Sequence, residues 1–220
     1  MSSVSVIIVD DHPIFIQGLK IILDSNKDYN VVGEAGDGKT AFQQIAEKKP
    51  DLVIVDLNLG NEDGLDLIKQ IKKLYPEMKT LVLSMLDERN YAERALLAGA
   101  RGYIMKEETA DVLLSALDTV IAGEIWLSPR EKSRYLDALF SSGRKSAGNT
   151  PQSLLESLSD RQLLVLSLMG KGLGTLDIAE KLFISPRTVE AHKDQIKKKL
   201  RCKSSQELLQ FAIEWANRRY

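Results

Sequence analysis

The sequence contains a single cysteine and no long apolar run, and each absence excludes a class of protein. The lone thiol of Cys202 cannot close an internal disulfide or build a cysteine-based metal site, which fits a reducing compartment. No apolar run approaches the roughly 18 residues of a membrane span. Residues 2–9 lack a basic flank and soon reach acidic residues, which predicts a strand rather than a signal peptide. We therefore expect a cytoplasmic protein without a membrane partner.

The formal net charge is only −1, but the two signs are unevenly distributed along the 220 residues. Residues 1–123 hold 13 basic and 20 acidic residues, a formal charge of −7. Residues 153–220 hold 12 basic and 8 acidic residues, a formal charge of +4. A basic C-terminal part attached to an acidic N-terminal part favours a polyanion as the partner of the C-terminal part.

The first 123 residues alternate short β-branched runs with helical patterns, which is typical of βα units around a parallel sheet. The predicted strands are 4–9, 30–35, 52–56, 80–84 and 102–105. The predicted helices are about 13–26, 38–48, 64–74, 88–98 and 108–122. We predict an α/β, flavodoxin-like (βα)5 domain with a parallel sheet of strand order 2-1-3-4-5. Such a domain binds its ligands beyond the carboxyl ends of the strands.

The pattern changes after residue 123. A short helix is predicted at about 130–140, and the polar, turn-forming residues 141–151 predict a linker. Strand signals are missing from residue 159 onward, and four helices are predicted at about 159–170, 175–182, 186–200 and 204–217. We therefore divide the chain into a first domain at 1–123, a linker at 124–152 and an all-α domain at 153–220.

Polar residues follow the carboxyl ends of four predicted strands: Asp10, Asp11, Asp56, Ser84 and Lys106. Each alone has an ordinary structural explanation, such as a helix N-cap, but in the predicted strand order all of them converge on one crevice. Three carboxylates in one pocket repel one another unless a divalent cation joins them, and hard oxygen ligands suit Mg²⁺. A metal-held carboxylate beside a lysine indicates a phosphoryl acceptor, because Mg²⁺ and Lys106 offset charge on the transferred oxygens and Ser84 can donate to them.

Four motifs make residues 4–122 resemble the receiver domain of bacterial two-component response regulators: VDDHP (9–13), VDLNL (55–59), LVLS (81–84) and GARGYIMK (99–106). The resemblance implies that a sensor histidine kinase phosphorylates Asp56. It implies a magnesium site formed by Asp11, Asp56 and the backbone carbonyl of Asn58, with Asp10 reaching the metal through water. It also implies a switch pair, in which Ser84 moves to the phosphoryl group while the ring of Tyr103 turns inward.

The same resemblance implies that the chain accepts a phosphoryl group and loses it by autodephosphorylation, so we do not expect a turnover enzyme. One departure from the receiver pattern bears on that loss. Met85 and Leu86 follow the switch serine, where small or polar residues are frequent in the family. Our hypothesis is that they shield the acyl phosphate from water and slow its hydrolysis.

Residues 33–40 also match the phosphate-binding pattern G-x-x-x-x-G-K-[ST], between a predicted strand and a helix, as in P-loop NTPases. Two observations weaken this alternative. Glu34 and Asp37 put negative charge among the amides that would hold a polyphosphate. The second strand also lies at the sheet edge in the predicted order, away from the acidic crevice. The alternative leaves that crevice unexplained.

Apolar residues of the last domain form one face across two predicted helices that break at residues 183–185, a spacing typical of a helix-turn-helix. The face comprises Leu176, Ile178, Ala179, Leu182, Ile184, Val189 and Ile196. The second helix opposes this face with a basic stripe and begins at Pro186 after the N-cap candidate Ser185. Such a helix can enter the major groove of DNA with its first turns against base edges.

Residues 158–200 closely resemble the LuxR-type helix-turn-helix of NarL/FixJ response regulators, with similarity from about 155 to 217. The resemblance implies that Glu190, Ala191 and Asp194 face the bases of double-stranded promoter DNA, and Glu190 can accept from cytosine N4. We predict phosphate contacts by Thr188, Lys193 and Lys197, which set register and salt dependence.

These inferences predict a DNA-binding response regulator. Phosphorylation of Asp56 is expected to shift a pre-existing equilibrium toward a form that dimerises and frees the recognition helix, which controls transcription. The expected partners are the sensor kinase, promoter DNA, RNA polymerase and a second copy of the phosphorylated chain. Two alternatives remain: a P-loop NTPase, and a phosphorylation-independent transcription factor with a vestigial acidic pocket.

Overall fold

The computed structural model describes residues 3–60, 62–141, 155, 157–182 and 184–217, with the side chains of 136–141, 160 and 217 excepted. The chain forms two compact units, Met1–Gly143 and Arg144–Tyr220. Most of the polar segment predicted as a linker, residues 142–151, lies outside the described residues. None of the described helices combines the length and the apolar character needed to cross a bilayer.

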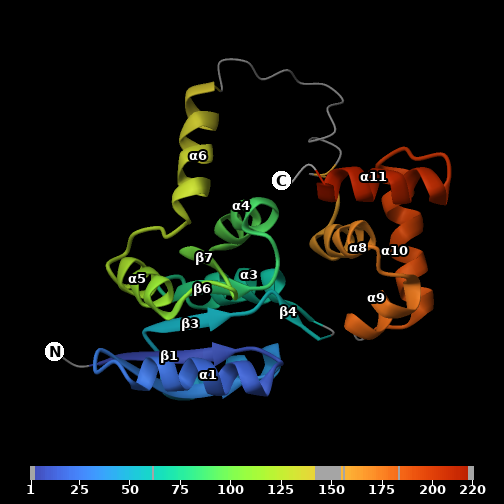
Figure 1. The fold of residues 1–220 in the computed structure, drawn as a ribbon. Coiled ribbons are helices and arrows are strands. Elements are labelled where there is room, and N and C mark those ends of the chain that lie inside the picture. Colours follow the sequence, from blue (N-terminus) through green and yellow to red (C-terminus); the bar gives the residue numbers. More distant parts are fainter. Residues whose placement is uncertain (1–2, 61, 142–154, 156, 183, 218–220) are drawn as a thin grey trace. The chain divides into compact units, whose positions relative to one another are not determined.

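The first unit is built on a five-stranded parallel sheet (Figure 1). Its strands are β1 (Val4–Val9), β2 (Tyr29–Ala35), β3 (Leu52–Val55), β6 (Lys79–Ser84) and β7 (Gly102–Met105). They lie in the order β2-β1-β3-β6-β7, so the predicted 2-1-3-4-5 arrangement is confirmed. Strands β1 and β3 are buried along their apolar lengths because helices cover both faces of the sheet.

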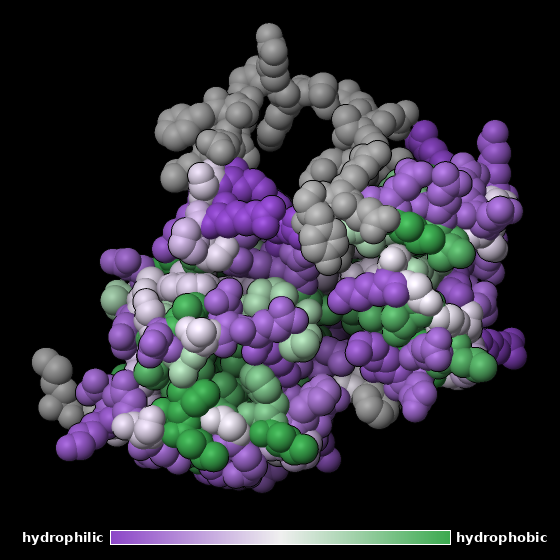
Figure 2. Space-filling view, in the orientation of Figure 1, coloured by the Kyte–Doolittle hydropathy of each residue, from purple (hydrophilic) through white to green (hydrophobic). Residues whose placement is uncertain are grey.

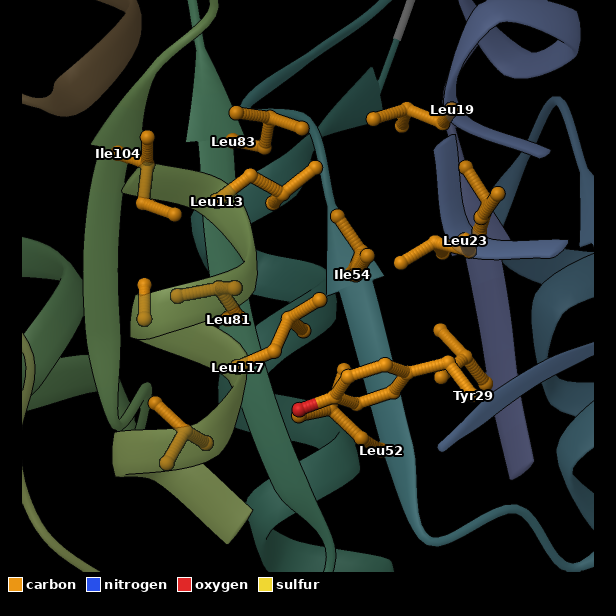
Figure 3. Packing of buried hydrophobic residues seen from close by; sticks show 14 of the residues in the cluster. Leu19, Leu23, Tyr29, Leu52, Ile54, Leu81, Leu83, Ile104, Leu113 and Leu117 are labelled. Atoms are coloured by element: carbon orange, nitrogen blue, oxygen red, sulfur yellow. The ribbon is translucent and has the colours of Figure 1, made fainter. Parts of the chain in front are cut away.

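Five helices flank this sheet: α1 (Pro13–Asp24), α2 (Gly38–Lys48), α3 (Gly64–Leu74), α4 (Glu88–Ala98) and α5 (Ala110–Ile121). Helices α1 and α5 share one hydrophobic cluster with the sheet, in which Leu19, Leu23, Leu113 and Leu117 pack against strand residues (Figure 3). Alternate strand residues such as Ile7 point to the other face and are equally buried. Burying an aliphatic side chain contributes about 1.5–3 kcal/mol, so this double-sided core fixes the strand ends in place.

A short antiparallel hairpin follows β3, formed by β4 (Asn58–Leu59) and β5 (Glu62–Asp63). Its turn uses Gly60 at φ +56°, a backbone conformation that glycine adopts without strain. Gly64 then packs directly on the backbone after β3, where an added Cβ would meet the carbonyl oxygen of Asp56. The hairpin was not predicted from the sequence, and it places the start of α3 against the end of β3.

After α5 the chain returns to the edge of the sheet. The amide of Trp126 donates to the carbonyl of Arg101 (2.9 Å), and the amide of Tyr103 donates to the carbonyl of Trp126 (3.2 Å). Helix α6 (Pro129–Ser141) follows, close to the predicted short helix. The segment after residue 123 therefore contributes to the first unit beside β7.

The second unit contains the four predicted helices: α8 (Asp160–Gly170), α9 (Thr175–Lys181), α10 (Pro186–Lys199) and α11 (Ser205–Asn217). Ser185 caps α10 by accepting from the Thr188 amide, with Pro186 at the first helical position, as predicted. The prediction that Leu176 joins the apolar face was wrong, because Leu176 is 72% exposed. Ile178 and Ala179 of the predicted face are buried, and at about 100° per residue Leu176 lies about 160° around α9 from Ile178.

Candidate functional site

Four residues from four different strand ends meet at the carboxyl edge of the first unit's sheet. Asp10 follows β1, and Asp56 follows β3 with its amide donating to the Val9 carbonyl (2.9 Å). Ser84 ends β6 and accepts at its carbonyl from the amide of Lys106 (2.9 Å), which follows β7. These backbone bonds hold the strand ends in register. The structure thus brings together the residues that the sequence predicted to share one crevice.

Lys106 is buried between two carboxylates. Its Nζ lies 2.5 Å from Asp10 Oδ2 and 2.8 Å from Asp56 Oδ2, and the three side chains are only 3–4% exposed. The ring of Phe15 on α1 covers the same ammonium, with 4.2 Å between Nζ and the ring centroid, a cation–π contact. Phe15 was missed in the sequence, because one aromatic residue in a helix gives no signal that separates it from a core residue.

The second oxygen of Asp56 is held by a hydroxyl. Ser84 Oγ donates to Asp56 Oδ1 over 2.8 Å, and the amide of Asn58 donates to the same oxygen over 3.2 Å. Burial raises the pKa of the Asp56 carboxyl, while the charge and hydrogen bond of Lys106 oppose that rise. A desolvated carboxylate that keeps its charge through a neighbouring ammonium is a competent nucleophile.

The donor set beside Asp56 fits a hard divalent cation. Asp10, Asp11, His12 and Asp56 each offer a ligand atom, and these atoms lie within 4.8 Å of one another. Asp11 Oδ1 is buried and accepts no hydrogen bond, although Nδ1 of His12 lies 2.7 Å away. A buried carboxylate oxygen that accepts no hydrogen bond and lies among other carboxylates is a suitable ligand atom for Mg²⁺. Asn58 lies two residues after Asp56, and it stays a prediction that its backbone carbonyl is a metal ligand.

Tyr103, the predicted partner of Ser84 in the switch, is fully buried on β7. Its hydroxyl donates to the backbone carbonyl of Leu86 (2.7 Å), and burial raises its pKa well above the ordinary value. The ring therefore faces inward in this structure. The Leu86 amide lies 3.4 Å from Ser84 Oγ, so the segment after β6 is bonded to both members of the predicted switch pair.

The same segment continues into a contact between α4 and α6. The Glu88 carboxylate accepts from the Ser128 amide (2.9 Å), and the Arg134 guanidinium donates to the Arg89 carbonyl (3.0 Å). Glu131 is 1% exposed and lies 3.3 Å from Arg134 Nε; burial raises its pKa. We call this set the α4–α6 contact. It was missed in the sequence because its members lie some 40 positions apart without any shared pattern.

Two amides of the loop that resembles a P-loop are already bonded to carboxylates. The Thr40 amide donates to Asp37 (2.7 Å), and the Gly38 amide donates to Glu62 (2.7 Å). Its strand, β2, lies at the edge of the sheet, as predicted. Carboxylates thus occupy two of the amides that a polyphosphate would need, as at a capped helix start.

In the second unit, α10 buries Val189 and Ile196 and leaves the predicted DNA-contacting residues accessible. Thr188, Glu190, Ala191 and Asp194 are exposed, and Lys193 and Lys197 are half-buried. Each carboxylate pairs with the lysine three residues later: Glu190 with Lys193 at 3.1 Å, and Asp194 with Lys197 at 2.9 Å. At these positions the recognition helix therefore offers neutral acid–lysine pairs, while Arg187, Lys198 and Lys199 keep the helix basic as a whole.

Two family models match the chain. The response regulator receiver domain matches residues 6–118, and the luxR family of bacterial regulatory proteins matches residues 156–212. The chain is similar to the oxygen regulatory protein NreC of Staphylococcus epidermidis, with 37% identity over 95% of this chain and 96% of the relative. The NreC protein of Staphylococcus aureus is 38% identical over the same shares.

Solved structures agree with this assignment. RcsB of Salmonella enterica serovar Typhimurium, bound to the promoter P1flhDC in the presence of the phosphomimetic BeF3⁻, gives a TM-score of 0.61 at 28% identity, covering 96% of this chain and 98% of that one. A LuxR-family two-component response regulator from Aurantimonas gives a TM-score of 0.59 at 28% identity, covering 64% of this chain and 100% of that one. The similarity thus extends over both units.

Proposed function

The chain belongs to the response regulators that join a receiver domain to a LuxR-type DNA-binding domain, and we propose that phosphorylation of Asp56 controls its binding to promoter DNA. The observation that carries the proposal is the buried Asp56 carboxylate, held by Lys106 on one oxygen and by Ser84 on the other. We propose that the protein acts in the cytoplasm, where the DNA it regulates lies.

In the proposed reaction, an oxygen of Asp56 attacks the phosphorus of a phosphohistidine on the sensor kinase. A P–O bond forms, the P–N bond breaks, and the electron pair returns to the kinase imidazole, which takes up a proton from solvent. Lys106 already lies 2.8 Å from Asp56 Oδ2 and offsets charge on the arriving oxygens. Asp10, Asp11, Asp56 and the Asn58 carbonyl would hold Mg²⁺, which when bound supplies further positive charge there.

An exposed apolar surface next to the pocket supports docking of the kinase. Helix α1 begins three residues after Asp10, and its Ile14 and Ile21 are 89% and 72% exposed. Figure 2 shows this apolar surface over α1. Exposed apolar patches on a folded domain mark sites of protein contact. A kinase that delivers a phosphoryl group to Asp56 must cover the surface beside it, and α1 offers apolar area for that contact.

The α4–α6 contact supports a route by which the signal leaves the pocket. After phosphorylation, Ser84 donates to a phosphoryl oxygen instead of Asp56, which displaces the segment that Leu86 and Glu88 belong to. Glu88 is bonded to Ser128 at the start of α6, so the displacement reaches the chain that leads to the second unit. We propose that this change favours a dimer, in which two recognition helices bind two half-sites of a promoter.

Water ends the signal by attacking the acyl phosphate, which releases inorganic phosphate and regenerates the Asp56 carboxylate. We propose that the chain catalyses only this loss from itself. Met85, which directly follows Ser84, is 55% exposed and presents an apolar side chain at the surface there. This position supports the hypothesis that Met85 limits the access of water to the phosphoryl group.

Incubation with acetyl phosphate and Mg²⁺, followed by intact-mass measurement, tests the proposal. We expect the full chain to gain the mass of one phosphoryl group, and Asp56→Asn to gain none. Asp66→Asn is the matched control, because Asp66 is 63% exposed on α3 and its loss leaves the pocket intact. Equal labelling of wild type and Asp56→Asn would refute the assignment, and no labelling of either would favour a vestigial pocket.

A further inference from the structure

The carboxylate of Glu190 is held by a residue outside the recognition helix. Thr175 is the first residue of α9, and its Oγ1 donates to Glu190 Oε1 over 2.5 Å. Lys193 Nζ donates to the same Thr175 Oγ1 over 2.5 Å and to Glu190 Oε1 over 3.1 Å. These contacts form a closed triangle of polar groups between the two helices of the helix-turn-helix. We call it the Thr175 triangle.

The triangle leaves one oxygen of Glu190 available. Both bonds go to Oε1, and within the described part of the chain Oε2 accepts no hydrogen bond. The bond from Thr175 is the first cause, and Lys193 a further one, of a lowered Glu190 pKa, so the side chain stays a carboxylate. A carboxylate has acceptors only. Oε2 therefore suits one hydrogen-bond donor on a base edge.

Fixing Glu190 also removes a cost of recognition. A free glutamate side chain loses rotamer entropy when it is ordered. In this structure the Glu190 side chain is already ordered without DNA, because Thr175 on α9 and Lys193, one turn further along α10, both bond to it. Preorganisation of this kind strengthens the interaction that it serves. It also prevents the side chain from turning away when the wrong base is present.

We propose that Thr175 is a specificity-determining residue, which positions Glu190 so that Oε2 accepts from the amino group of cytosine at one position of the DNA site. The proposal rests on the proposed base contact of Glu190. In the major groove, cytosine presents an amino donor alone, whereas adenine places the N7 acceptor beside its amino group, and guanine and thymine present only acceptors, which a fixed carboxylate repels. The triangle thus both favours the right base pair and penalises the wrong ones.

The test uses the full chain treated with acetyl phosphate and Mg²⁺. Selection from a randomised duplex library defines the preferred site of the wild type, and competition with single-base variants then gives the discrimination at each position. Glu190→Ala identifies the position that Glu190 reads. Thr175→Val removes the hydroxyl but keeps the branched shape, and Thr175→Ser keeps the hydroxyl. Thr119→Val, the same change on α5 of the other unit, is the control.

We expect Thr175→Val to lose about tenfold discrimination at the position identified by Glu190→Ala, which corresponds to about 1.4 kcal/mol. Affinity for unrelated DNA and the salt dependence should not change, and Thr175→Ser should retain the wild-type preference. If Thr175→Val discriminates like the wild type, or loses affinity uniformly at every position, the role of Thr175 is overturned. If Glu190→Ala changes the discrimination at no position of the site, the proposed base contact of Glu190 is refuted instead.

Discussion

Replacing Lys106 by methionine removes the ammonium between Asp10 and Asp56 but keeps an unbranched side chain of similar length. Two carboxylates that are each 3% exposed then lose their shared partner. Breaking a buried ion pair by removing one partner costs about 3–5 kcal/mol. Asp56, whose pKa burial already raises, relieves part of this cost by taking up a proton. We therefore expect the free energy of unfolding of the first unit to fall by about 3 kcal/mol at pH 7.

This loss depends on pH with a definite sign. A carboxyl whose folded-state pKa lies above its unfolded value binds more protons in the folded state, so stability falls as pH rises. The pKa of Asp56 already lies above its ordinary 3.8, and Lys106 is the main influence that opposes the rise. The destabilisation of Lys106→Met is therefore greatest at neutral pH and shrinks as pH falls toward that ordinary value. Added Mg²⁺ should restore stability at pH 7, because it replaces the lost positive charge.

Urea unfolding followed by Trp126 fluorescence measures the effect. Trp126 is buried against β7, and Trp215→Phe in every variant removes the signal of the second unit. Lys69→Met is the matched control, since its pair with Asp66 is exposed and worth at most about 1 kcal/mol. The reasoning is refuted if Lys106→Met unfolds like Lys69→Met, or if its loss of stability is the same at pH 5 and pH 8.

Three further substitutions test other parts of the account. Gly64→Ala puts a Cβ against the Asp56 carbonyl and should lower the free energy of unfolding by about 1–3 kcal/mol. Gly18→Ala, with nothing within 4 Å of its Cβ, should not lower it, and equal melting temperatures of the two variants would contradict this. Glu88→Ala leaves the Ser128 amide without its carboxylate and should weaken the increase in DNA affinity on phosphorylation; a full increase would exclude the α4–α6 route. Met85→Ala should shorten the half-life of the phosphorylated chain, and an unchanged half-life would end the shielding hypothesis.

The strands and their order were predictable because the apolar runs are continuous and each is followed by a helical pattern. The same reasoning brought Asp10, Asp56, Ser84 and Lys106 together, since parallel strands end at one edge of a sheet. The hairpin β4–β5 was not predictable in this way. Its strands have two residues each, which is too short for any alternation to appear.

Contacts that depend on tertiary placement were not predictable either. Glu88 meets Ser128 across 40 positions, and Thr175 meets Glu190 only because the turn between α9 and α10 brings their helices together. The prediction for Leu176 was wrong for a related reason. Leu176 stands two positions before the buried Ile178, which puts the two side chains about 160° apart around the helix, and the sequence alone does not fix which side of the seven-residue α9 packs inward.

The central claim is that a phosphoryl group on Asp56 controls the binding of DNA by the second unit. The most direct measurement is the affinity of the full chain for its selected DNA site, with and without acetyl phosphate and Mg²⁺, beside Asp56→Asn under the same conditions. The account predicts tighter binding of the treated wild type and no response from Asp56→Asn. Equal affinity of the treated and untreated wild type, at a measured stoichiometry of one phosphoryl group, would contradict it.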